Sequence, residues 1–262
     1  MKKLCILIFS FLILGYFASG HSNSLQLISY PNFYENPLLT ERMRKLMAPH
    51  LLPPDHPIKE KLDAIFSKSR AIQNQKALTD AGFIILGARP ISFIIVARHP
   101  EVPGYIFKLY LDTELRKKKE VAHWEWLTRR CVGAKKIKAT IKKHKLKYFT
   151  VPDKWLYILP QYPLSQEPNP QPFILVETYL DLHKDSERIW KTRVEPKHLD
   201  ELYIIYDSGY GSSEVGKNVP YTKKGKFAFV DTESPKRKPR LKRVKKYLSR
   251  DMQHYWDNYI HE

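Results

Sequence analysis

Cysteine is almost absent from this chain of 262 residues, which contains only Cys5 and Cys131. Cys5 falls in an apolar N-terminal segment that we expect to be cleaved off, so the mature chain would keep one cysteine. A single cysteine can form no intrachain disulfide, and the fold must then be stabilised by packing alone. Cys131 follows a helical pattern and is most simply a small buried hydrophobic residue.

Several catalytic motifs are missing as well. The sequence has no zinc-ligand spacing, no Cys/His dyad, no HExxH and no nucleophile elbow. Hydrolase functions therefore have no support in the sequence.

Acidic residues are scarce relative to basic ones. The chain has 27 Asp and Glu against 45 Lys and Arg, which gives a formal net charge of +18. A charge of this sign favours acidic partners, such as nucleotides, nucleic acid, phosphoproteins or an anionic membrane. The 16 Tyr and 5 Trp argue against a disordered tail protein.

Residues 1–20 have the three parts of a secretory signal peptide. Lys2 and Lys3 precede an apolar run over residues 4–17, and small residues follow it up to Gly20. The run is short for a membrane span, although a retained N-terminal anchor is the alternative. We therefore expect a secreted or periplasmic protein that has no stable transmembrane span after cleavage.

The rest of the chain predicts an α+β fold whose parts share one cleft. Residues 21–78 are rich in proline and predict an N-terminal extension with short helices. Residues 79–180 predict a small antiparallel sheet with one inserted helix. Residues 181–262 predict a short, mostly helical lobe that ends in a basic segment.

Three β-prone runs, at residues 83–86, 92–97 and 105–111, are separated by turns that contain proline and glycine. This spacing predicts an antiparallel meander. Lys108 lies in the third run and shares a strand face with Ile106 and Tyr110. A lysine with such neighbours is unusual, although its amino group could extend to water.

Asp112 and Thr113 follow the third run and are typical of a helix start. Helical spacing from this start places Glu120 on the apolar face of the helix, where it could pair with Lys108. Glu125 is an open alternative for the same role. The simplest explanation of either carboxylate is a solvated side chain on a highly charged helix.

Residues 217–233 contain two β-prone runs around a turn at Lys224 and Gly225. A hairpin would bring Asn218 and Asp231 to the same end. An amide and a carboxylate at the end of an apolar hairpin could hold Mg²⁺, which favours oxygen ligands. The alternative is a surface hairpin whose polar end residues are merely solvated.

The order of these features resembles the protein-kinase-like fold, which includes small-molecule phosphotransferases. The matching positions are spread over about residues 83–233. The resemblance implies that Lys108 holds the α and β phosphates of ATP and pairs with Glu120 or Glu125. It also implies that Asn218 and Asp231 hold Mg²⁺, with Asp-Thr-Glu in place of the usual Asp-Phe-Gly.

The same resemblance implies that the linker from Glu177 to Tyr179 contacts an adenine ring. The catalytic loop, however, departs from the family, which has an aspartate five residues before the asparagine. That position is Ser213 here, which cannot act as an ordinary base. Asp207 and Glu214 are nearby carboxylates and become the candidate catalytic residues. The turn at residues 87–90 also lacks a glycine-rich phosphate loop.

Three functions remain compatible with the sequence. The first is a secreted, degenerate kinase-like protein that binds a nucleotide with Mg²⁺ and, if active, transfers phosphate. The second is a non-catalytic, pseudokinase-like protein that binds an acidic protein or an anionic surface. The third is nucleic-acid binding through the lysine runs at residues 135–147 and 236–246. We favour the third least, because the runs lack interleaved aromatic residues and a solvated face explains most such runs.

Overall fold

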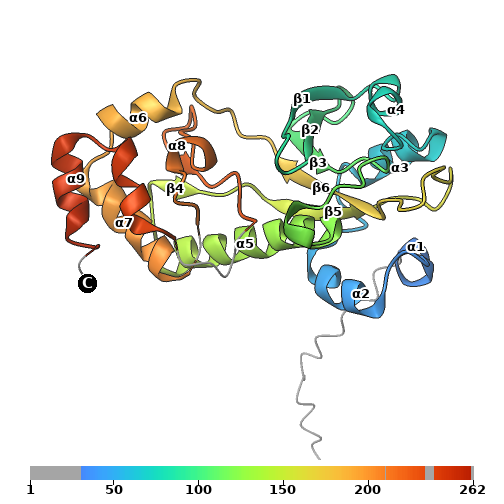
Figure 1. The fold of residues 1–262 in the computed structure, drawn as a ribbon, viewed down its shortest axis with the longest axis horizontal. Coiled ribbons are helices and arrows are strands. Elements are labelled where there is room, and N and C mark those ends of the chain that lie inside the picture. Colours follow the sequence, from blue (N-terminus) through green and yellow to red (C-terminus); the bar gives the residue numbers. More distant parts are fainter. Residues whose placement is uncertain (1–30, 210, 234–238, 261–262) are drawn as a thin grey trace, which may run out of the picture.

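The structure is a computed structural model that describes residues 31–209, 211–233 and 239–260. It is an α+β protein, as predicted, with an antiparallel five-stranded sheet and helices on both sides (Figure 1). No helix in these three ranges is long and apolar enough to span a membrane. The expected signal peptide and part of the basic run at residues 236–246 lie outside the described residues.

The five strands of the main sheet follow the order β1-β2-β3-β6-β5. Neighbouring strands are antiparallel, so the predicted meander of the first three is confirmed. Strand β6 lies between β3 and β5, and its first five residues are buried. This position explains its continuous apolar run. The strand bounds are β1 (Ile84–Ala88), β2 (Ile95–Arg98), β3 (Tyr105–Leu109), β5 (Lys154–Ile158) and β6 (Phe173–Thr178).

Helices cover both faces of this sheet. On one face, α3 (Lys59–Lys68) and α4 (Gln75–Asp80) pack in a core with Phe107 and Tyr157. The opposite core contains residues of α1 (Pro31–Glu35), α2 (Glu41–Met47) and the first half of α5 (His123–Lys143). The short 3₁₀ helix η1 (Ala48–His50) follows α2. The N-terminal helices are therefore integral to the sheet cores.

Helix α5 joins the sheet to the second part of the molecule (Figure 1). Its residues Leu127 and Cys131 belong to the core of the sheet, which confirms that Cys131 is buried. Further along the same helix, Ala134 and Ile137 belong to the core of the helical part. Because one helix contributes to both cores, it fixes how the two parts face each other.

Helix α5 begins at His123, whereas the sequence predicted a start at Asp112 and Thr113. The carboxylate of Asp112 is fully buried and accepts hydrogen bonds from the guanidinium of Arg70. It is therefore not available to cap a helix. The short 3₁₀ helix η2 (Lys118–Glu120) intervenes, and Lys119 within it has a φ of 55°. A left-handed residue of this kind interrupts an α-helix.

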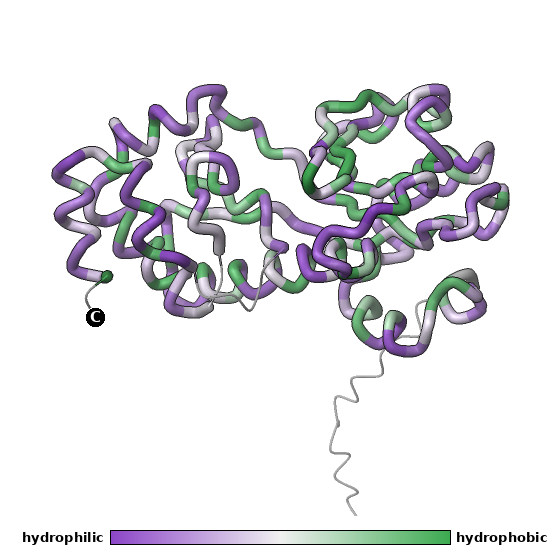
Figure 2. The backbone as a smooth tube through the Cα atoms, viewed as in Figure 1, coloured by the Kyte–Doolittle hydropathy of each residue, from purple (hydrophilic) through white to green (hydrophobic). Residues whose placement is uncertain are grey.

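The second part is mostly helical and has its own core, in which Trp190, Phe227 and Trp256 are almost completely buried. A two-stranded parallel sheet of β4 (Phe149–Thr150) and β7 (Phe227–Ala228) contributes to it. Hydrophilic residues are frequent along the helices of this part, whereas hydrophobic residues are frequent along the strands of the main sheet (Figure 2). The helices are α6 (Ser186–Thr192), α7 (Pro196–Asp207), α8 (Val215–Asn218), α9 (Arg250–Asp257), η3 (Leu241–Arg243) and η4 (Lys245–Tyr247).

Residues 217–233 fold back on themselves, although less regularly than a β-hairpin. Asn218 ends helix α8, and the two arms are joined by a bridge between Tyr221 and Phe227 and by a backbone hydrogen bond from Ala228 to Pro220. Gly225 occupies the turn with a φ of 81°, which glycine adopts without steric cost. The N–H of Val230 donates to the carbonyl of Asn218 at 3.1 Å. This bond brings Asn218 and Asp231 to the same end, as predicted.

Candidate functional site

A cavity of about 270 Å³ lies between the sheet and the returning segment 217–233. Ile94 and Val96 form an apolar part of its lining, and Asn218 lies on the side of the returning segment. Five cations and two carboxylates also line the cavity, so it is electropositive. The cations are Arg89, Lys108, Lys118, Arg130 and Lys217, and the carboxylates are Asp231 and Glu233.

Lys108 and Lys154 share the carboxylate of Glu177. The Nζ of Lys108 is 3.0 Å from Oε1, and the Nζ of Lys154 is 3.0 Å from Oε2. Strand pairing explains this arrangement, because Lys154 lies directly opposite Glu177 and Lys108 lies diagonally opposite it. Both lysines also donate to the carbonyl of Val230, at 2.9 and 2.8 Å. The sheet thereby holds the returning segment through two charged hydrogen bonds.

This three-residue cluster is buried, with Glu177 only 2% exposed and Lys154 fully covered. Burial acts to raise the pKa of Glu177, but the charges of Lys108 and Lys154 outweigh it and hold that pKa below its ordinary value. Burial also lowers the pKa of Lys154, to about 8, against the opposing charge of Glu177. The carboxylate is therefore what keeps two buried ammonium groups compensated.

Lys108 thus pairs with Glu177, and neither Glu120 nor Glu125 takes the role predicted for it. Glu120 precedes α5, has a φ of 55° and is exposed. Glu125 lies in the first turn of α5, and its carboxylate is 2.6 Å from the guanidinium of Arg129. The late start of α5 explains the difference for Glu120, since this residue lies before the helix and so has no place on its apolar face.

The linker residues do not line this cavity. Glu177 faces the two lysines, and the side chain of Tyr179 is 53% exposed. The backbone N–H of Thr178 donates to Asp153 at 3.0 Å, and that of Tyr179 donates to Gly104 at 2.8 Å. The backbone donors of the linker are therefore already bonded within the protein.

Arg130 is the side chain of α5 that reaches the returning segment. Its guanidinium Nη2 is 2.6 Å from Glu233, and its Nε is 3.6 Å from Asp231. Only 3% of this side chain is exposed. Lys118 contacts the other oxygen of Glu233 at 2.5 Å. Arg130 was not among the predicted site residues, although its position four residues after Trp126 and four before Ala134, both buried, was a signal that could have revealed it.

Residues 231–233 also contact the backbone of α5. The hydroxyl of Thr232 donates to the carbonyl of Arg130 at 2.6 Å. One turn along the helix, a Cβ on Gly133 would lie 2.2 Å from the carbonyl oxygen of Thr232. Only glycine permits so close an approach. Asp231 and Glu233 are therefore held in a fixed register against Arg130.

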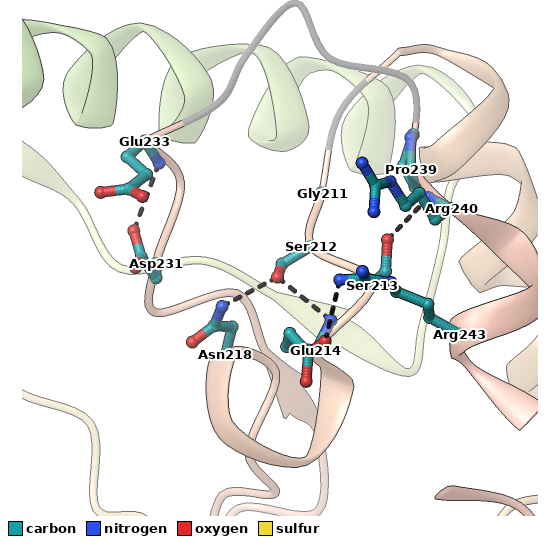
Figure 3. Close-up of a pocket in the computed structure, with 10 residues that line it drawn as sticks. All are labelled: Gly211, Ser212, Ser213, Glu214, Asn218, Asp231, Glu233, Pro239, Arg240 and Arg243. Atoms are coloured by element: carbon teal, nitrogen blue, oxygen red, sulfur yellow. Dashed lines mark hydrogen bonds and ion pairs between the residues drawn. The ribbon is translucent and has the colours of Figure 1, made fainter. Parts of the chain in front are cut away.

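A second, smaller cavity of about 180 Å³ shares Asn218, Asp231 and Glu233 with the first. Figure 3 shows these three residues on one side, with Ser213 and Arg240 on the other. The amide of Asn218 donates to the hydroxyl of Ser212 at 2.8 Å. The hydroxyl of Ser213 accepts from the backbone N–H of Arg240 at 2.7 Å.

The two candidate catalytic carboxylates differ in position. Glu214 lines the second cavity, but its carboxylate accepts from Tyr247 at 2.7 Å and from Lys246 at 3.0 Å. The bonds from Tyr247 and Lys246 lower the pKa of Glu214, which makes it a weaker base. Asp207 is exposed at the end of α7 and lines neither cavity.

The predicted Mg²⁺ ligands do lie together, but their surroundings suit a divalent cation poorly. Burial acts to raise the pKa of Asp231, yet the charges of Arg130, Lys108 and Lys154 hold it below its ordinary value. These cations already compensate the carboxylate and would repel an added metal ion. The described ranges contain no group of three or more His, Cys, Asp or Glu side chains arranged to hold a metal. This donor set fits an anion better than Mg²⁺.

Comparison with models of known protein families and with curated proteins finds no match for this sequence. The comparisons therefore assign neither a family nor an activity.

Proposed function

We propose that this chain binds a nucleotide through its phosphates, in the cavity between the sheet and segment 217–233, without transferring phosphate. The observation that carries this proposal is the excess of cations over carboxylates in a cavity of about 270 Å³. This volume is close to the lower end of ligand pockets, about 300 Å³. Ile94 and Val96 supply an apolar wall on which the base or ribose can pack.

The arrangement of elements supports a kinase-like site. An antiparallel sheet carries Lys108, a long helix follows that strand, and Asn218 and Asp231 lie together across the cavity. In place of a glycine-rich loop, the turn between β1 and β2 offers the charged side chain of Arg89. A phosphate group can accept hydrogen bonds from an arginine in such a position.

The residues around the second cavity support binding without transfer. Ser213 stands where the family has its catalytic aspartate, and its hydroxyl already accepts a backbone hydrogen bond. Glu214 is held by Tyr247 and Lys246. No carboxylate among the residues that line this cavity is therefore placed as an uncommitted base for an incoming hydroxyl.

A thermal shift experiment on the full chain tests the proposal. ATP, adenosine and inorganic triphosphate are compared at one ionic strength, because a ligand that binds only the folded state raises the melting temperature. We expect a rise with ATP, a smaller rise with triphosphate and the smallest with adenosine. The absence of any rise with ATP would overturn the proposal.

Two exposed cations allow a test that leaves the buried charges intact. Replacing both Arg89 and Lys217 by glutamine should weaken ATP binding by about tenfold, since each removes a charge from the cavity lining. The matched control is Arg98→Gln, an exposed arginine on β2 outside the cavity lining. Equal affinities in the double variant and the control would argue against this cavity as the binding site.

The exposed lysines at the end of α5 support a second candidate function, the binding of an acidic partner. Lys142, Lys143 and Lys145 are exposed, and the described residues place no carboxylate within ion-pair distance of them. Sedimentation with vesicles that contain anionic lipid, over a range of salt concentrations, tests this function. Wild-type binding that falls with salt, and is lost on replacing the three lysines by glutamine, would support it.

A further inference from the structure

We infer that Arg130 serves this site as its resident cation, so that the nucleotide is bound without a divalent metal ion. The inference rests on the proposed function and specifies how that site holds phosphate. It departs from the metal site that the sequence predicted at Asn218 and Asp231.

The first basis is the charge around Asp231. A kinase-like arrangement would leave this carboxylate free to hold a metal ion. Here the guanidinium of Arg130 lies 3.6 Å from Asp231 and 2.6 Å from Glu233, and Lys118 contacts Glu233 as well. A fixed positive charge therefore already occupies the side of Asp231 that faces the helix, and a divalent ion would have to overcome its repulsion.

The second basis is the position of the Arg130 charge relative to the cavity. Its side chain belongs to the cavity lining, while its Nε is buried and lies 3.6 Å from Asp231, beyond hydrogen-bond distance. Its Nη1 donates to the carbonyl of Trp126 at 3.2 Å, and its Nη2 donates to Glu233 at 2.6 Å. Arg130 would therefore attract a phosphate in the cavity through its charge, while its N–H groups hold it on the protein.

The third basis is the rigid attachment of residues 231–233 to α5. The bond from Thr232 to the carbonyl of Arg130 and the close contact at Gly133 fix the backbone of this segment on the helix. Two lysines of the sheet hold the preceding carbonyl, that of Val230. The pairing of Arg130 with Asp231 is therefore set by contacts on both sides, and it does not depend on one flexible side chain.

The two hypotheses, a metal ion at Asp231 or Arg130 as its counter-charge, predict opposite effects of Asp231→Asn on the ATP affinity. If Asp231 is a metal ligand, the amide should weaken ATP binding more than tenfold. If Arg130 is the counter-charge, removal of one negative charge beside the phosphates should strengthen binding, by about threefold. Asp207→Asn, the same change at an exposed residue that lines neither cavity, is the matched control.

The deciding measurement is isothermal titration of the full chain with ATP, once in EDTA and once with Mg²⁺. An affinity in EDTA equal to or higher than that in Mg²⁺ supports the inference. Binding that requires Mg²⁺ overturns it and leaves the proposed function standing. Absence of binding in both buffers overturns the proposed function together with the inference.

Variants of the cations complete the test. Arg130→Gln should weaken binding in EDTA at least tenfold, whereas Arg130→Lys should retain part of the affinity. Because Arg130→Gln leaves two carboxylates without their main partner and could prevent folding, Lys118→Gln provides a milder second variant. Lys118 is 17% exposed, and its loss should weaken binding in EDTA about threefold. Full affinity in both Lys118→Gln and a folded Arg130→Gln protein would overturn the inference.

Discussion

The ammonium group of Lys108 lies 3.0 Å from Glu177, a carboxylate on the neighbouring strand, and Lys154 binds the other oxygen of the same group. The ion pair of Lys108 therefore lies within the sheet. No glutamate from helix α5 takes part. This frees the inner face of α5 for Arg130, which binds the acidic residues that follow Val230.

Glu177→Gln should destabilise the protein by about 3–5 kcal/mol, because it leaves two buried ammonium groups without a counter-charge. Urea denaturation measures the change in the free energy of unfolding. The matched control is Glu125→Gln, whose partly exposed pair with Arg129 should contribute no more than about 1 kcal/mol. Similar losses in the two variants would contradict the central position of Glu177.

Gly133→Ala should destabilise the protein by about 1–3 kcal/mol, even though alanine favours a helix. The added Cβ would lie 2.2 Å from the carbonyl oxygen of Thr232, so the segment that carries Asp231 would have to move. The melting temperature and the ATP affinity should both fall. Gly87→Ala is the control, since a Cβ there meets no atom within 4 Å. A Gly133→Ala protein as stable as this control would show that the segment is not packed on α5.

Stability should decline as the pH falls below about 6.5, and His50 should contribute to the first part of this decline. Burial, with the nearby charge of Lys135, lowers the pKa of His50 to about 4 in the folded protein, from 6.5. Between these two values the unfolded chain binds a proton that the folded chain does not. The free energy of unfolding therefore falls as the pH drops through this window.

At lower pH, the carboxylates of Glu177 and Asp231 contribute to the loss of stability. The folded-state pKa values of Glu177 and Asp231 lie below their ordinary ones. Their stabilising effect is thus present above the ordinary pKa and is lost as the pH falls through the folded pKa. Urea denaturation at a series of pH values checks both parts. His50→Gln should flatten the curve between pH 6.5 and 4, while His144→Gln, at an exposed position of the α5 C-terminus, should not.

When the protein is incubated with ATP labelled at the γ-phosphate, we expect no transfer of the labelled phosphate to water or protein. The background level is the transfer measured with the double variant in which Arg89 and Lys217 are replaced by glutamine. The reason is that Ser213 and Glu214 are both engaged in hydrogen bonds. Transfer that is lost in Glu214→Gln, but kept in the exposed control Glu60→Gln on α3, would refute this prediction. It would also identify Glu214 as the base.

The local pattern of the sequence was sufficient to predict the strands of the meander and the proximity of Asn218 and Asp231. Apolar runs separated by proline and glycine predicted the meander of β1 to β3. Helical spacing predicted that Cys131 is buried, and the turn at Gly225 predicted that Asn218 and Asp231 come together. These features depend on neighbours within a few residues, or on a chain that simply folds back on itself.

The partners within the site were decided only by the tertiary structure. Lys108, Lys154 and Glu177 meet because of the register between strands that are far apart in the sequence. Arg130 reaches Asp231 because α5 packs against residues 231–233, where Thr232 donates to the carbonyl of Arg130. Composition alone determined that the protein is strongly basic. Which of its many cations is buried beside two carboxylates was decided by the packing of α5 against residues 231–233, because only long-range contacts distinguish among side chains of the same charge.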